Sequence, residues 1–246
     1  MIAAAERVFE FLNAQEETER ERLLPMGEVE GRVLFDRVGF GYDKDKPVIK
    51  GFTCDVKPGQ TVAIVGHTGA GKTTMVKLLM RFYDVDEGAI LVDGQDVRNH
   101  KRQDLRQAFG MVLQDTWLFS GTIMENIRYG RPDATDEEVI AAAKAAHADH
   151  FIRTLSGAYD MQLNEEADNI SQGQRQLLTI ARALLADNPI MILDEATSNV
   201  DTLTELRIQR AMQTLMQGRT SFVIAHRLST IREADVILVM QDGNIV

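Results

Sequence analysis

The chain has 246 residues, which suits one large α/β domain or two smaller lobes and is ample for a packed core. Its formal net charge of −10 argues against nucleic acid as the main partner, because nucleic-acid binders usually carry a basic footprint. The single cysteine, Cys54, excludes a disulfide framework or a zinc cluster and suits a reducing compartment. Apolar runs such as Ile190–Leu193 are far shorter than the roughly 18 residues of a membrane span. The first residues also lack the basic character of a secretory signal.

The first residues predict a helix, because four apolar side chains share one helical stripe: Ile2, Ala5, Phe9 and Leu12. This helix either packs on its own domain or is the end of a longer helix. The charged run Glu16–Arg22 then predicts a solvated linker, and the main body begins near Glu28.

The body opens with strand patterns. Val33–Phe35 and Val38–Phe40 predict two short strands around a turn, and the β-branched run Thr61–Val65 predicts a buried strand. A helix is predicted over Lys72–Phe82.

The middle third is helical. Thr135 and Glu138 form a capping box that opens an alanine-rich helix to about Ala148. Helical patterning continues through Phe151 and Ile152 and again over Ser171–Leu185. The last third alternates strand, helix, strand and strand, over Ile190–Leu193, Thr202–Leu215, Ser221–Ala225 and Val236–Met240. Alternation of this kind predicts a mostly parallel sheet into which the helical middle is inserted.

The strongest motif directly follows the strand Thr61–Val65. It matches G-x-x-x-x-G-K-S/T, with a buried strand before it and a helix after it. Glycines let backbone N–H groups surround phosphate oxygens, Lys72 reaches the β- and γ-phosphates, and the Thr73 hydroxyl can ligate Mg²⁺. The predicted nucleotide-binding residues are Gly66, His67, Thr68, Gly69, Ala70, Gly71, Lys72, Thr73 and Thr74.

A second element completes a hydrolytic site. The strand Ile190–Leu193 ends in two adjacent carboxylates, Asp194 and Glu195. Side chains alternate on a strand, so the two groups need not point the same way. Asp194 suits the Mg²⁺ shell, and Glu195 can then orient and deprotonate the attacking water. Such a pair is often only a helix cap, but beside a phosphate loop it indicates an ATPase.

One segment before the helix at Leu177 identifies the family. It resembles the signature loop of ABC-transporter ATPases, usually Leu-Ser-Gly-Gly-Gln, through Ser171, Gln172, Gly173 and Gln174. Other matches occur in family order. Gln114 resembles the Q-loop glutamine, Ser198–Asp201 the D-loop and His226 the switch histidine, while Tyr42 lies where the family stacks an aromatic ring on adenine. The resemblance covers about residue 28 to the end.

The resemblance implies an α/β fold: a P-loop NTPase core with a mostly parallel sheet, an N-terminal antiparallel β subdomain and an inserted α-helical subdomain over about 115–186. The ATPase domain would span 28–246. Arg7–Leu12 is similar to the tail of the last transmembrane helix of exporters, so 1–27 would be that tail and a linker. Phe119–Ile127 is also exporter-like, and we expect the chain to be truncated at both ends.

In this family two ATPase domains dimerise head to tail around ATP and Mg²⁺, each ATP lying between one P-loop and the partner's signature loop. By resemblance, Glu195, His226 and Gln114 are catalytic, Thr73, Gln114 and Asp194 hold the metal, and Asp201 couples the two sites. The implied partners are a second ATPase domain and an exporter's membrane domain, without nucleic acid. The implied place is the cytoplasmic face of the membrane, and the isolated domain would be soluble.

One departure concerns the first signature glycine, which is Gln172 here. Either Gln172 faces solvent and does not impair the ATP site, or the chain belongs to a heterodimeric exporter in which one composite ATP site is catalytically weak. We favour the heterodimer, in which this chain would keep the working carboxylate Glu195.

Two other functional classes compete with an exporter ATPase. A soluble ATPase of nucleic acid or ribosomes would carry long coiled coils or a second ATPase unit, and an importer ATPase would lack the helix at Arg7–Leu12.

Overall fold

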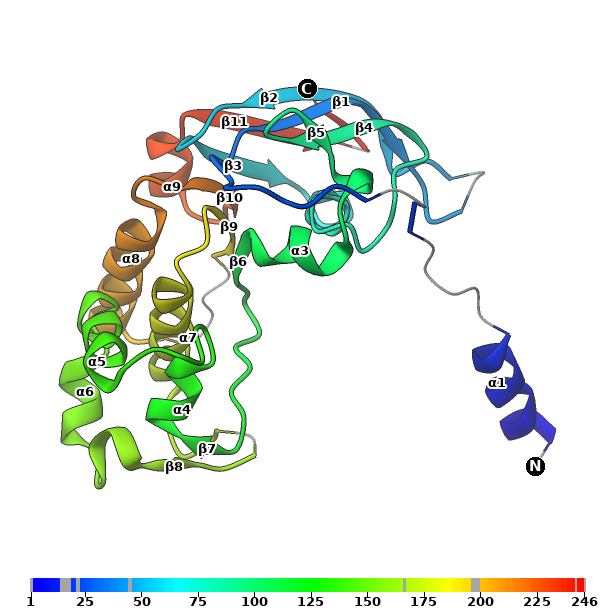
Figure 1. Ribbon diagram of the computed structural model, residues 1–246. Helices are drawn as coiled ribbons and strands as arrows, with labels where there is room; N and C mark the ends of the chain where they lie inside the picture. The colour runs from blue at the N-terminus through cyan, green and yellow to red at the C-terminus, as the bar shows by residue number, and fades with distance from the viewer. Residues whose placement is uncertain are drawn as a thin grey trace.

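The computed structural model describes residues 2–13, 19–20, 23–43, 46–165, 167–195, 200–241 and 243–245. Figure 1 shows a body of two sheets with a helical layer beside it, and the helix α1 (Ile2–Leu12) standing apart from that body. The predicted N-terminal helix is therefore present, and Phe9, Phe11 and Leu12 on it are exposed. The charged run Glu16–Arg22 lies largely outside the described residues.

The first sheet is antiparallel and has the strand order β2-β1-β4-β5. Its strands are β1 (Val33–Phe40), β2 (Ile49–Val56), β4 (Glu87–Val92) and β5 (Gln95–Asp96). This is the antiparallel β subdomain that the family resemblance implied.

The prediction of two strands over Val33–Phe35 and Val38–Phe40 is wrong, because β1 is one continuous strand with a bulge. Arg37 takes a positive φ of 50°, and the pairing with β2 shifts register between Phe35 and Val38. The extra residue turns Arg37 outward and returns Val38 to the buried side, where Phe35 and Val38 are each 1% exposed. The break in the hydrophobic alternation marks this bulge and not the end of a strand.

The second sheet is mostly parallel and has the strand order β12-β11-β3-β10-β9-β6. Its strands are β3 (Thr61–Gly66), β6 (Phe109–Val112), β9 (Ile190–Asp194), β10 (Thr220–Ile224), β11 (Val236–Gln241) and β12 (Asn244–Ile245). Only β12 runs antiparallel to its neighbour within the described part of this sheet. Ile64 on β3 pairs with Ile224 on β10, which pairs with Asp194 on β9, so these strands end at one edge.

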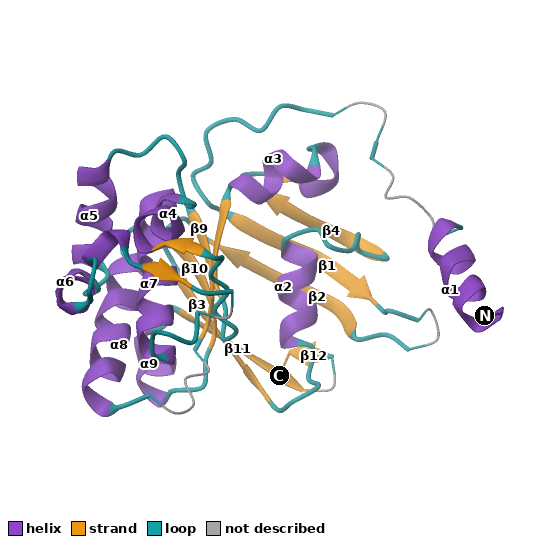
Figure 2. Ribbon diagram, turned by 90° about the horizontal axis from the view of Figure 1, so that it is seen from below, coloured by secondary structure: helices purple, strands orange, loops and turns teal. Residues whose placement is uncertain are grey.

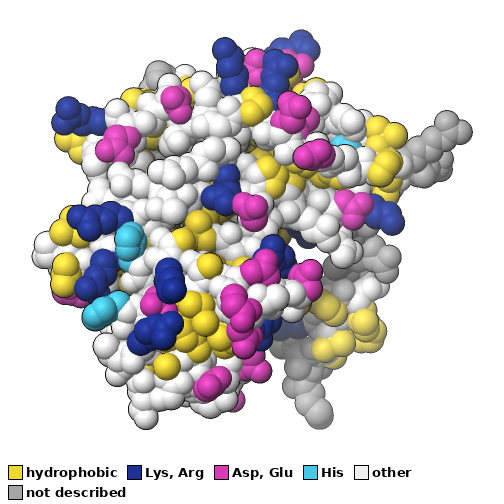
Figure 3. All heavy atoms as spheres, turned by 60° about the vertical axis from the view of Figure 1, so that its left-hand side comes forward, with side chains coloured by type: hydrophobic (Ala, Val, Ile, Leu, Met, Phe, Trp, Pro, Cys, Tyr) yellow, Lys and Arg dark blue, Asp and Glu magenta, His cyan; other side chains and the backbone are white. Residues whose placement is uncertain are grey.

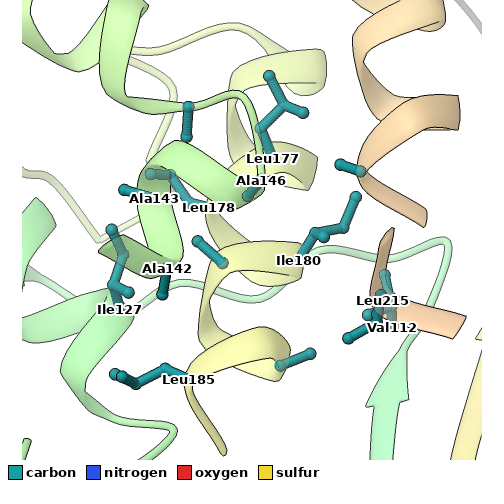
Figure 4. Close-up of a cluster of buried hydrophobic side chains, with 14 of the residues drawn as sticks. Val112, Ile127, Ala142, Ala143, Ala146, Leu177, Leu178, Ile180, Leu185 and Leu215 are labelled. Atoms are coloured by element: carbon teal, nitrogen blue, oxygen red, sulfur yellow. The ribbon is translucent and has the colours of Figure 1, made fainter. Parts of the chain in front are cut away.

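The helical layer covers one face of the parallel sheet (Figure 2). It contains α4 (Ile123–Arg128), α5 (Asp136–Ala145), α6 (Asp149–Thr154), α7 (Gln172–Ala186) and α8 (Thr202–Met216), with a small hairpin of β7 (Gly121–Thr122) and β8 (Gln162–Leu163). Figure 4 shows Leu178 of α7 facing alanines of α5, whereas Ile180 points the other way, toward α8. The small alanine side chains let α5 approach α7 closely.

The predicted capping box at the start of α5 is confirmed, since Thr135 accepts from the Glu138 N–H and Glu138 accepts from the Thr135 N–H. The helix ends at Ala145 and not at Ala148, because His147 takes a left-handed φ of 56° before α6 begins. The remaining helices are α2 (Lys72–Leu79), α3 (Arg102–Gln107) and α9 (Leu228–Glu233), with 3₁₀ turns η1 (Val97–Asn99) and η2 (Ala158–Asp160).

Two hydrophobic cores lie on opposite faces of the parallel sheet. On β9, Ile190 and Ile192 join the core shared with the antiparallel sheet, whereas Met191 and Leu193 join the core of the helical layer. All four side chains are fully buried. A strand covered on both faces is apolar throughout, which explains the unbroken run before Asp194.

On the molecular face shown in Figure 3, Lys and Arg side chains are interspersed with Asp and Glu and do not gather into one basic patch. Among the described residues, no helix combines the length and hydropathy needed to cross a bilayer.

Candidate functional site

The sequence motifs meet at the carboxyl edge of the parallel sheet. The glycine-rich loop follows β3, the Asp194–Glu195 pair ends β9, and His226 follows β10, which lies between them. Backbone bonds join these strand ends: the Ala225 N–H donates to Ile64 O at 3.1 Å and the Glu195 N–H to Ile224 O at 3.3 Å. Open α/β sheets bind ligands at this edge.

The glycine-rich loop joins β3 to α2 and requires its glycines sterically. A Cβ on Gly66 would lie 2.4 Å from the Met240 carbonyl oxygen, so no larger residue fits there without a shift of backbone. Gly71, the N-cap residue of α2, takes a left-handed φ of 105° that other residues rarely adopt. Lys72 Nζ donates to Gly66 O at 2.7 Å and His67 O at 3.0 Å, which places a positive charge within the loop.

Tyr42 lies next to this loop. Its hydroxyl is 3.2 Å from the Thr74 Oγ1 at the start of α2, and Lys77 lies over its ring at 5.6 Å. Its ring also makes edge contacts with Phe40 and Tyr83, and 52% of Tyr42 is exposed. The structure thus places an accessible aromatic ring beside the phosphate loop, where a base could stack on it.

The two carboxylates at the end of β9 have different surroundings. Asp194 Oδ1 is 3.8 Å from His226 Nε2, a distance too long for a hydrogen bond. Glu195 Oε1 accepts a hydrogen bond from the Thr230 hydroxyl of α9. The predicted divergence of the two side chains is therefore observed, because each faces a different residue of the segment after β10.

The residues present fit a magnesium ion. Asp194 Oδ1 is buried and has no hydrogen-bond partner among the described residues, as expected of an oxygen that ligates a metal when nucleotide binds. The described residues form no cluster of three or more His, Cys, Asp or Glu side chains that could hold a metal alone. A single carboxylate and a hydroxyl suit Mg²⁺, which keeps waters and takes further ligands from substrate phosphates.

The signature segment starts α7. Ser171 is the N-cap, its Oγ accepts from the Gln174 N–H at 3.3 Å, and the Gln174 Oε1 accepts from the Ser171 N–H at 2.9 Å. No acidic residue lies in the first turn of this 15-residue helix. The positive end of its dipole is therefore not neutralised by its own first turn.

Gln172 and Gln114 line the same open surface hollow, together with Asp168, Trp117 and Arg175. Gln172 is half-buried and Gln114, just beyond β6, is exposed. The structure thus brings the altered signature position beside this domain's own Q-loop.

Gly173 packs tightly against the start of α8. A Cβ at Gly173 would lie 2.4 Å from Thr204 Cγ2 and 3.0 Å from Val200 Cγ1. Asp201 is the N-cap of α8, and the hydrogen bond that its carboxylate accepts from the Thr204 N–H at 3.0 Å holds the pKa of Asp201 below its usual value. Ser198 and Asn199 of the predicted D-loop lie outside the described residues.

The sequence analysis missed two features of this region. Thr230 contacts Glu195, and the only local signal was a hydroxyl four residues after His226. Trp117, Phe119 and Tyr129 also form an aromatic cluster close to Gln114, with ring centroids 5.7–6.4 Å apart; Trp117 and Tyr129 are exposed and Phe119 is half-buried.

The mostly parallel sheet, with the phosphate loop and the acidic pair at its carboxyl edge, defines a P-loop ATPase. Residues 49–198 match the ABC transporter family. A fatty acid ABC transporter ATP-binding/permease protein of Mycobacterium tuberculosis is 57% identical over 246 residues, which is 100% of this chain and 39% of that protein. An ATP-dependent lipid A-core flippase of Methylobacillus flagellatus is 47% identical over 247 residues, 100% of this chain and 42% of the flippase.

A solved structure of a bacterial Atm1-family ABC exporter with ATP bound is 42% identical, with a TM-score of 0.88, and the match covers 100% of this chain and 43% of that one. The chain therefore belongs to the ABC transporter family, and it is an ATP-binding ATPase domain of the exporter type. It spans about two fifths of the length of these relatives. The predicted family, fold and enzyme class are confirmed.

Proposed function

We propose that this chain binds MgATP at its P-loop, closes head to tail on a second ATPase domain and powers export through a membrane domain. The observation that carries the proposal is the meeting of three elements at one sheet edge: the phosphate loop, the Asp194–Glu195 pair and His226. The names of the relatives, which are ATP-binding/permease proteins, support a membrane partner and a place at the cytoplasmic side of a membrane.

In the proposed site Lys72 neutralises the β- and γ-phosphates, while Thr73, Asp194 and Gln114 would hold Mg²⁺. The metal supplies charge neutralisation on the phosphates. Glu195 accepts a proton from the attacking water, and His226 contacts the γ-phosphate. Tyr42 stacks on adenine.

The partner's signature loop would complete the site. The un-neutralised N-terminus of α7 supports this role, because backbone N–H groups and a helix dipole bind phosphate. Ser171 is exposed and belongs to this helix start, so a γ-phosphate held by a partner domain could approach it. Asp201, on the adjoining start of α8, lies where it could couple the two composite sites.

The aromatic cluster Trp117, Phe119 and Tyr129, of which two rings are exposed, supports a docking surface for the membrane domain. Trp117 is 63% and Tyr129 60% exposed, and Arg182 stacks over the Tyr129 ring at 5.3 Å. Because the cluster follows Gln114 in the chain, movement of Gln114 at the nucleotide could reach the docked membrane helices.

The preference for a heterodimer rests on Gln172 alone. Its half-buried position beside Gln114 of its own domain supports the other interpretation. In that interpretation Gln172 does little harm to the composite ATP site, and two identical chains pair. Sedimentation of the Glu195→Gln chain with MgATP separates the two. A dimer formed by this chain alone supports identical partners, and a monomer at high concentration supports a partner of different sequence.

The central test is Glu195→Gln. We expect hydrolysis to fall by about 10²–10⁴-fold, the usual contribution of a general base, while ATP binding is kept. Single-turnover assays at high protein concentration avoid a limit set by dimerisation. Glu137→Gln, at an exposed position of α5, is the matched control and should hydrolyse ATP normally. Equal turnover in Glu195→Gln and the unaltered chain would refute the base assignment.

A further inference from the structure

Among the described residues, the carboxylate of Glu195 is held from one side only. Its Oε1 accepts a hydrogen bond from the Thr230 hydroxyl, and Thr230 is 8% exposed. Its Oε2 is buried and has no hydrogen-bond partner among the described residues. A carboxylate with one anchored oxygen and one spare buried acceptor is suited to take a proton from a donor that arrives with the substrate.

The space beside this carboxylate is not filled by side chains of the described residues. A cavity of about 330 Å³ lies there, lined by Glu195, Thr230 and α8 side chains that include Ile208, Met212 and Met216. Because Glu195 borders this space, its side chain has room to turn into it. Among the described residues, the hydrogen bond from Thr230 is the polar contact that selects one orientation of the carboxylate.

The helix that carries Thr230 is itself clamped. Three residues spaced four apart on one face of α8 bind α9 and the residue before it. Glu205 pairs with Arg227 at 2.8 Å, Gln209 donates to Ser229 Oγ at 3.3 Å, and Gln213 donates to Glu233 at 3.3 Å. These contacts tie α9 to one face of α8 at three positions, so the Thr230 hydroxyl is carried by a helix that is anchored on α8.

The same segment carries the switch histidine. His226 and Arg227 precede α9 directly, and Thr230 lies four residues beyond His226. A displacement of this segment would therefore move the hydroxyl that holds Glu195 together with the imidazole that faces Asp194.

We propose that Thr230 is a positioning residue for ATP hydrolysis, which anchors Glu195 Oε1 so that Oε2 is presented to the attacking water. This proposal rests on the assignment of Glu195 as the base under the proposed function. Thr230 does not touch nucleotide in this scheme and acts only through Glu195.

The test compares Thr230→Val, which keeps the shape and removes the hydroxyl, with Thr230→Ser, which keeps the hydroxyl. We expect Thr230→Val to lower the single-turnover rate about 10-fold, within the loss that a misplaced catalytic group causes, with KM for MgATP unchanged within about twofold. Thr230→Ser should restore the rate. Thr214→Val is the matched control, because the hydrogen bond that the Thr214 hydroxyl makes within the described part of the chain goes to Arg210 O of its own helix, and its rate should be normal.

A second comparison shows whether Thr230 acts through Glu195. In the Glu195→Gln background, Thr230→Val should lower the residual rate no further, since residues that act as one unit are not additive. An equal 10-fold loss in both backgrounds would overturn the proposal, as would a Thr230→Ser chain as slow as Thr230→Val. If Thr230→Val is not recovered folded, Thr230→Ala carries the same expectations.

The two proposals fail in different ways. Normal hydrolysis by Thr230→Val beside a slow Glu195→Gln chain overturns the role of Thr230 and leaves the base assignment intact. Normal hydrolysis by Glu195→Gln overturns the base assignment and the Thr230 proposal with it.

Discussion

Gly173 joins the signature helix to the helix that carries Asp201, and a single methyl group tests this contact. In Gly173→Ala the new Cβ would lie 2.4 Å from Thr204 Cγ2 and 3.0 Å from Val200 Cγ1. Carbon atoms in contact normally lie about 3.5–4.0 Å apart, so the starts of α7 and α8 must separate by about 1 Å. Overpacking of this kind typically costs about 1–3 kcal/mol.

The cost is partly offset, because alanine favours a helix over glycine by about 1 kcal/mol. We therefore expect a net loss of about 1 kcal/mol in the free energy of unfolding, which for a chain of this size is a fall in Tm of about 2–4 °C. The effect on ATP-dependent dimerisation should be larger, since both the signature loop and Asp201 shift.

Urea and thermal unfolding of the nucleotide-free chain measure the stability. Thr204→Ser removes the Cγ2 methyl that the new Cβ would strike, so it should recover most of the lost stability when combined with Gly173→Ala. A Gly173→Ala chain as stable as the original, or no relief from Thr204→Ser, would refute the steric argument.

Two further predictions concern the helical layer. Ser171→Ala removes the cap of α7 and should lower the free energy of unfolding by about 1 kcal/mol in urea, whereas Ser171→Thr should cost less. Burial and the hydrogen bond to Asp149 at 2.7 Å raise the pKa of Tyr159 above its ordinary value of about 10. The unfolded chain loses this proton first, so its contribution to stability is complete below about pH 10 and falls as pH rises further. Tyr159→Phe should show a smaller decline above pH 10 in urea titrations, and an unchanged decline would contradict this account.

Local chemistry determined much of this protein. The capping boxes at Thr135 and Ser171 satisfy helix N–H groups from within four residues, so both helix starts were predicted correctly. The phosphate loop was predicted from its own residues, although Gly66 is also required by the Met240 carbonyl of β11, which the loop's sequence does not indicate. The apolar run before Asp194 predicted a strand, and β9 is one, with its side chains buried on both faces of the sheet.

Patterns weakened by neighbouring strands were harder to interpret. The strand β1 was divided wrongly at Arg37, because the bulge is a response to pairing with β2 and β4. The strand β2 was not predicted, and its interior Gly51 with a positive φ of 63° interrupts its alternation.

Only the tertiary structure decided which side chains meet across the site. Thr230 and Glu195 are 35 residues apart, and they touch because β9 and β10 pair in parallel and polar side chains of α8 hold α9 and the residue before it. Gly173 and Thr204 meet because α7 packs beside α8, and no spacing along the chain encodes that contact. The residues proposed to bind and cleave ATP follow from the sequence. The hydrogen bonds and close contacts that orient them depend on distances between segments, which only folding sets.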